Sequence, residues 1–264
     1  MASVTFPKIG EKHNLRPLYG AEHTVSKGSS SMPKRAVFIY NNDIRKIMTK
    51  ELGLYRDSAL EKAVMNPEHV LKSRKAKELL VVKLGIGAPL TAVVAEELFS
   101  LGVEEILIIG IAGAVKRWLD FGGLIICSKA VRDEGTSHHY LKNGLYSYPD
   151  SMLTARLESI MKVLGIGYSK GPTWTIDAPY VETIEEVKHY RGKGIFTVEM
   201  EAAALFAVAK KRGRGAAALF TVSDILDPEE GWSGFSDEGK RKRKREAYPK
   251  IARVALAYGL NGRR

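Results

Sequence analysis

The fold of this chain is decided by a stretch that reads LLVVKLGIGAPLTAVVAEEL over residues 79–98. Its first six residues form an apolar run typical of a buried strand, which Gly85 and Gly87 then interrupt. Pro89 favours the first turn of a helix. The apolar face of that helix would consist of Leu90, Val93, Val94 and Leu98. The stretch therefore predicts a buried strand that passes through a glycine turn into a helix.

The same alternation recurs along the chain. An apolar run at 36–40 precedes a helix that Asp43 would cap, and EILII at 105–109 precedes the glycine-rich turn 110–113. Further strands are predicted at 124–131, 174–176, 195–198 and 216–222, and further helices at 151–164, 199–212 and 238–258. This order predicts an α/β fold with a mainly parallel or mixed central sheet and helices on both faces. Residues 1–33 are expected to be an irregular lead-in, and residues 34–264 a single domain.

Composition limits the classes of protein. The chain has 264 residues, 45% of them hydrophobic, with no apolar run long enough to cross a bilayer and no targeting peptide at its start, so a cytoplasmic protein is expected. Cys127 is the only cysteine, which excludes an internal disulfide and favours a core thiol. The net charge of +11 owes much to KRKRKR at 240–245, a run that could bind nucleic acid. The solvated start of a helix is favoured, because no interleaved aromatic residues accompany the run.

In α/β folds, ligands bind beyond the carboxyl ends of the strands. The two glycine turns, 85–87 and 110–113, stand at such strand exits, where backbone amides can approach an anion. Neither turn is a complete nucleotide-binding fingerprint, and for each turn taken alone a structural role is favoured over an anion site.

The most informative segment is VEMEAAALF at 198–206, where two carboxylates flank a methionine as a strand gives way to a helix. A carboxylate there is well placed to accept hydrogen bonds from both hydroxyls of a ribose. Alternatively, Glu199 and Glu201 complement the dipole of the helix in its first turn. Composition leaves both interpretations open.

VEME at 198–201 resembles the signature of the nucleoside phosphorylase and uridine phosphorylase superfamily, which also contains nucleosidases. From about His23 onward, the motifs of the family occur in the same order in this chain. Among the members of the family, the chain is most similar to the uridine-phosphorylase-like branch. It continues through GIGAP at 85–89, GIAGA at 110–114, AVRDEGTSHHY at 130–140, TIDAPYVET at 175–183 and VSD at 222–224.

The resemblance implies roles for several residues. Met200 and Glu201 would hold the ribose, with Glu201 accepting from the 2′- and 3′-hydroxyls. His23 would reach the ribose of a neighbouring subunit, in a homo-oligomer that is a dimer or a hexamer of dimers. Arg45 and Gly87 would bind phosphate, which serves as co-substrate, and no other cofactor is expected.

The base site implied by the resemblance centres on Ser223 and Asp224. In purine-cleaving relatives the aspartate protonates or hydrogen-bonds N7 of the leaving base; as an alternative, Asp224 caps the next segment. Tyr180 and Trp174 would either stack on the base or belong to the core. The neighbouring histidines His138 and His139 lack the spacing and the partners of a zinc site, so no metal is expected.

The chain also departs from the pattern of the family. Asn41-Asn42-Asp43 stands where phosphorolytic relatives have Pro-Gly-Asp, and Ile108 and Ile111 replace two phosphate ligands. Val181-Glu182-Thr183-Ile184 replaces the uracil-reading residues of uridine phosphorylases, which leaves the choice between purine and pyrimidine open.

The expected activity is phosphorolysis of a nucleoside to free base and ribose 1-phosphate, catalysed by a pentosyltransferase. The first alternative is a nucleosidase that uses water. The second is a basic nucleic-acid-binding protein on a degenerate enzyme fold. The expected partners are nucleoside and phosphate, with neither membrane nor nucleic acid.

Overall fold

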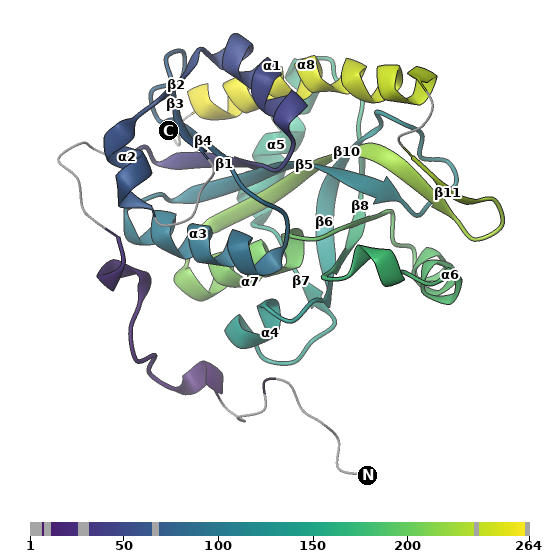
Figure 1. The fold of residues 1–264 in the computed structure, drawn as a ribbon, viewed down its shortest axis with the longest axis horizontal. Helices are drawn as coiled ribbons and strands as arrows, with labels where there is room; N and C mark the ends of the chain where they lie inside the picture. The colour runs from purple at the N-terminus through teal and green to yellow at the C-terminus, as the bar shows by residue number, and fades with distance from the viewer. Residues whose placement is uncertain (1–6, 8–11, 26–31, 65–68, 235–237, 262–264) are drawn as a thin grey trace.

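The computed structural model describes residues 7, 12–25, 32–64, 69–234 and 238–261. A twisted sheet lies between two layers of helices, and residues 12–25 lie along the outside of the domain (Figure 1). The fold is therefore the predicted single α/β domain with helices on both faces of the sheet.

The sheet contains strands of unequal length. They are β1 (Arg35–Ile39), β2 (Leu54–Arg56), β3 (His69–Ser73), β4 (Leu79–Lys83), β5 (Glu105–Ala114), β6 (Leu124–Asp133), β7 (Tyr146–Ser147), β8 (Ser169–Ile176), β9 (Thr197–Glu199), β10 (Gly215–Asp227) and β11 (Gly231–Ser233). The longest of them, β10, is parallel to β5 and antiparallel to β6.

The helices are α1 (Asn42–Leu52), α2 (Ser58–Ala63), α3 (Ala88–Ser100), α4 (Ser137–Tyr140), α5 (Ser151–Val163), α6 (Ile184–Gly192), α7 (Ala202–Arg212) and α8 (Glu238–Leu260). Single 3-10 turns are η1 (Lys12–Asn14), η2 (Ala21–His23) and η3 (Pro179–Val181). Helices α1, α5 and α8 cover one face of the sheet, and α3 and α7 cover the other (Figure 1).

The strand pairings close part of the sheet on itself. β5 pairs with β10, β10 with β6, β6 with β8, β8 with β9, and β9 returns to β5. From β5, an open sheet extends through β1, β4 and β3 to β2, while β7 pairs with β6 and β11 pairs with β10. The closed ring brings the ends of β5, β9 and β10 together, although they are far apart in the sequence.

Local sequence explains how the elements begin. Pro89 occupies the first turn of α3, as expected. The expected cap of α1 was wrong: Asn41, rather than Asp43, accepts from the amides of Asp43 and Ile44. An asparagine side chain satisfies these free amides as well as an aspartate does.

Two large apolar clusters lie on opposite faces of the sheet. One packs the strands against α3 and α7, and the other packs them against α1, α5 and α8. Ile108 is fully buried in the first cluster, and Cys127 is the expected core thiol. Burial of this kind is the main stabilising contribution to a domain of this size.

Several elements differ from the sequence expectations. The basic run 240–245 begins α8, as predicted, while β2, β3, α2 and α6 were not expected. The division at residues 33 and 34 stays a prediction. In the described parts of the chain, no helix combines the length and apolar character needed to cross a bilayer.

Candidate functional site

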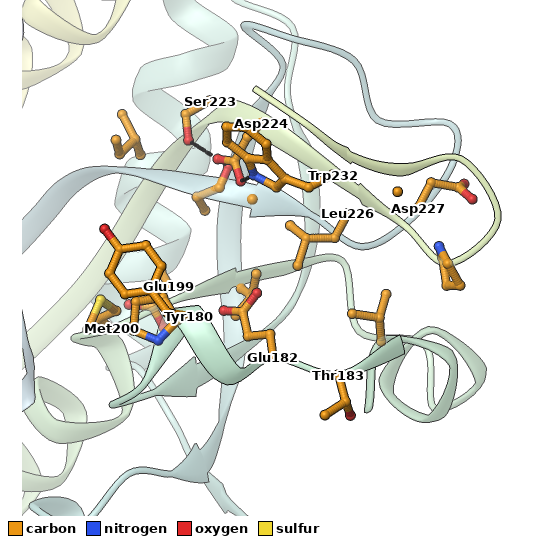
Figure 2. A pocket seen from close by; sticks show the side chains of 18 of the residues that line it. Tyr180, Glu182, Thr183, Glu199, Met200, Ser223, Asp224, Leu226, Asp227 and Trp232 are labelled. Carbon is orange, nitrogen blue, oxygen red and sulfur yellow. Dashed lines mark hydrogen bonds between the residues drawn. The ribbon is translucent and has the colours of Figure 1, made fainter. Parts of the chain in front are cut away.

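A cavity of about 670 Å³ opens where β5, β9 and β10 end. Its wall is formed by Gly113 of β5, Val198 of β9 and Ser223 of β10, and it is closed by the segment around η3 and by β11 (Figure 2). The volume lies in the range of small-molecule sites, and a wall that is mainly apolar with a few carboxylates suits a flat ligand that carries polar edges.

Glu199 organises the turn between β9 and α7. Its carboxylate accepts hydrogen bonds from the hydroxyl of Thr175 at 2.5 Å, the amide of Glu201 at 2.8 Å and the amide of Ala202 at 2.7 Å. It therefore satisfies amides that the first turn of α7 leaves unpaired. Glu199 also lines the cavity, so this buried carboxylate fixes the backbone beside a ligand.

Glu201 is buried next to Glu199. One of its carboxylate oxygens accepts from the amide of Gly87 at 2.8 Å, and the other accepts from the amide of Met200 at 3.3 Å. Burial raises the pKa of both glutamates, and the charge of Glu199 raises the pKa of Glu201 further. The two carboxyl groups are thus held close together in an environment where protonation of one of them is favoured.

Asp224 lies inside β10, at a bulge in its pairing with β5. One carboxylate oxygen accepts from the hydroxyl of Ser223 at 2.5 Å, and the other accepts from the indole nitrogen of Trp232 on β11 at 3.0 Å (Figure 2). The interpretation of Asp224 as a helix cap is wrong, because no helix begins there. The carboxylate is instead held at the edge of the cavity.

The opposite side of the cavity is formed by Tyr180 and Glu182, which flank the end of η3. Tyr180 is fully exposed at the mouth, and Glu182 is half-buried. Burial, and then the charges of Asp224 and Glu186, raise the pKa of Glu182 to about 7.

The structure gathers part of the predicted set in one place. Met200, Ser223, Asp224 and Tyr180 all line the cavity. Glu201 directly follows Met200 in the sequence. Of the two interpretations of Trp174, base contact or core, the structure supports the core: Trp174 is buried and donates to Asp133 at 2.8 Å. Its indole nitrogen needs a partner inside the protein, and Asp133 provides it.

The predicted phosphate ligands lie apart from this cavity. Arg45 is on the first turns of α1 and donates to Asn42 at 3.4 Å. The amide of Gly87 is occupied by Glu201, so in this state the glycine supports a carboxylate. Ile111 lines the cavity, whereas Ile108 points into the core.

The histidines singled out in the sequence do not line the cavity. His23, on η2, is exposed and contacts Gly20 and Glu22. His138 and His139 lie on α4, and the residues that the structure describes contain no group of three potential metal-ligating side chains.

Sequence reasoning gave no role to Trp232 or Glu182. Trp232 reaches Asp224 only because β11 folds back antiparallel on β10, with Leu226 opposite Trp232. Glu182 was noticed only as part of a segment that differs from uridine phosphorylases. Its proximity to Asp224 depends on the closed ring of strands, which no local pattern shows.

The closed ring of strands, with buried carboxylates at a sheet-end cavity, defines an α/β protein built to bind a small molecule with hydroxyl and N–H groups. The family model of the phosphorylase superfamily matches residues 50–258, and the chain belongs to this superfamily. Arg45 and His23 lie before the matched region.

Curated relatives share a moderate identity with the chain. A guanosine phosphorylase of Halorubrum lacusprofundi is 29% identical over 179 residues, which cover 68% of this chain and 74% of the relative. A uridine phosphorylase of Thermococcus kodakarensis is 29% identical over 164 residues, covering 56% of this chain and 58% of the relative. A purine nucleoside phosphorylase of Actinobacillus pleuropneumoniae is 32% identical over 154 residues, covering 58% and 64%.

Solved structures have the same fold. A purine nucleoside phosphorylase of Toxoplasma gondii superposes with a TM-score of 0.73 at 21% identity, covering 86% of this chain and 91% of that chain. A uridine phosphorylase of Vibrio fischeri gives a TM-score of 0.71 at 22% identity, covering 90% and 93%.

Proposed function

We propose that this chain is a nucleoside phosphorylase, which transfers the pentosyl group of a nucleoside from the base to inorganic phosphate. The observation that carries the proposal is the buried carboxylate of Glu201, which directly follows Met200 in the wall of a base-sized cavity edged by Asp224, in a chain of the phosphorylase superfamily. The names of the relatives, which include guanosine, uridine and purine nucleoside phosphorylases, support it.

Glu201 binds the ribose in this proposal. Each of its oxygens already accepts one backbone amide, so each keeps one acceptor position for a ribose hydroxyl. Because the carboxylate is buried and held by two amides, its position is fixed before substrate arrives. Met200 lies against the cavity and packs on the sugar.

Asp224 acts on the base. An oxygen of phosphate bonds to C1′ of the ribose while the bond between C1′ and the base nitrogen breaks, and that electron pair moves into the base. For a purine, a proton from Asp224 to N7 neutralises the developing charge, a contribution of about 10²–10⁴-fold in rate. Ser223 and Trp232 hold the carboxyl group in position for this transfer.

Arg45, on the first turns of α1, supplies positive charge for phosphate. Gly87 contributes through Glu201, because its amide holds that carboxylate. Phosphate is the co-substrate, and the proposal includes no further cofactor. A cytoplasmic homo-oligomer, in which His23 approaches a neighbouring ribose, completes the proposal.

The test is a nucleoside panel with guanosine, inosine, adenosine and uridine, incubated with and without phosphate. Chromatography follows the free base and distinguishes ribose 1-phosphate from ribose. We expect base release that requires phosphate and yields ribose 1-phosphate. Equal rates without phosphate, with ribose as product, would show a nucleosidase, and no turnover of any nucleoside would refute both activities.

A further inference from the structure

Glu182 is one of the carboxylates that line the cavity and have no role in the proposed mechanism. It is half-buried, and its side chain makes no hydrogen bond or ion pair with any residue that the structure describes. Asp224, in contrast, has both oxygens occupied by donors. A carboxylate that has no partner among the described residues and is partly withdrawn from water in a mainly apolar wall favours a ligand that brings hydrogen-bond donors.

The backbone around Glu182 is rigidly held. Thr183 and Glu186 form a capping box at the start of α6: the amide of Thr183 donates to Glu186 at 2.8 Å, and the amide of Glu186 donates to the hydroxyl of Thr183 at 3.2 Å. This reciprocal pair fixes the backbone of Thr183, the residue that follows Glu182. Glu182 therefore stands next to a fixed helix start, which limits the backbone entropy lost on binding.

The direction of the side chain decides what it can contact. Figure 2 shows the carboxylate of Glu182 directed across the cavity toward the side where Asp224 and Trp232 lie. Asp224 and Glu182 line the same cavity, and the charge of Asp224 contributes to the raised pKa of Glu182. A planar base that meets Asp224 through N7 can turn its Watson–Crick edge, which adjoins the N7 edge at O6, toward Glu182.

We propose that Glu182 reads the Watson–Crick edge of the base and selects guanine, an inference that rests on the proposed nucleoside phosphorylase function. Guanine carries two adjacent donors on this edge, the N1–H and the 2-amino group, which match the two oxygens of a carboxylate. Hypoxanthine offers only the N1–H. Guanosine is thus the preferred nucleoside, followed by inosine.

The other bases meet repulsion at the same place. Adenine presents the acceptor N1 beside its 6-amino donor, and an ionised carboxylate repels that acceptor. Uracil presents an N–H between two carbonyl oxygens, both of which face the negative charge. When only one base satisfies the hydrogen bonds of a polar group in a site, the site rejects the other bases strongly. With those bases, the polar group is left unpaired.

The test is Glu182→Gln, with Glu185→Gln as the matched control. Glu185 is exposed on α6 and does not line the cavity. A glutamine accepts from the 6-amino group of adenine and donates to N1, so the variant matches adenine instead of guanine. We expect the ratio of kcat/KM for guanosine to that for adenosine to fall about 10- to 100-fold in Glu182→Gln, and to stay unchanged in the control.

The ratio is measured within one preparation, so a loss of folded protein cancels. A wild-type enzyme that releases base but shows the same ratio in Glu182→Gln as in Glu185→Gln would overturn the inference and leave the proposed function intact. Wild-type protein that releases no base from any nucleoside would instead remove the proposed function itself.

Discussion

Replacing Asp224 by asparagine is the sharpest test of the base site. The carboxylate now accepts from Ser223 at one oxygen and from Trp232 at the other. An asparagine can keep both contacts, because its oxygen accepts from Trp232 while its NH₂ group donates to the hydroxyl of Ser223, which also has acceptor lone pairs. What it lacks is the proton that the leaving purine requires.

The loss of proton transfer alone raises the barrier by about 3–5 kcal/mol, which corresponds to a fall in kcat/KM for guanosine of about 10²–10⁴-fold. Uridine cleavage suffers less, because a pyrimidine has no N7. Asp177→Asn is the control, since Asp177 is exposed, holds only the amide of Gly135 and does not line the cavity. A guanosine rate in Asp224→Asn that stays within threefold of wild type would refute the reasoning.

The other predictions concern the ribose site, the pH profile and stability. Glu201→Gln lowers kcat/KM for purine and pyrimidine nucleosides alike, because it acts on the shared sugar; steady-state kinetics with guanosine and uridine check this, and an effect on only one class would contradict it. The ratio of kcat/KM for guanosine to that for adenosine rises as the pH increases through about 7, since Glu182 accepts both donors of guanine only when it is ionised and, when protonated, offers a donor to N1 of adenine. A ratio that is flat between pH 6 and 8.5 would speak against this. The other acids near Glu182 and the cavity are Asp224, Asp227, Glu186 and Glu199. Arg35→Gln lowers the free energy of unfolding in urea by about 2–4 kcal/mol, because the buried guanidinium of Arg35 donates to the carbonyls of Tyr258 and Gly259 at the end of α8. An unchanged midpoint would show that these bonds contribute little.

The sequence predicted the elements that carry their own local signal. The runs at 36–40 and 106–109 are continuously apolar because β1 and β5 are buried on both faces. β2 and β3 were missed, since they are short strands near the edge of the sheet that contain charged residues such as Arg56 and Lys72. Their strand character comes from pairing with each other, which no local pattern encodes.

The candidate site divides in the same way. Glu201, Met200 and Asp224 were found because family motifs surround them in the sequence. Glu182 and Trp232 were missed, because their positions follow from the closed ring of strands and from the register of β10 with β11. Residues that owe their place to long-range pairing are those for which a single sequence gives the weakest signal.

The bond from Trp232 to Asp224 has a consequence for dynamics. Trp232 stands on β11, a strand of three residues that pairs only with β10 at the end of the sheet. Such terminal hairpins open with a much smaller free energy than the whole domain. When this hairpin opens, one oxygen of Asp224 loses its donor, and the indole, already 60% exposed, passes fully into water. The fraction of molecules with the acid in position is then set by how often this hairpin is closed, while the rest of the domain remains folded.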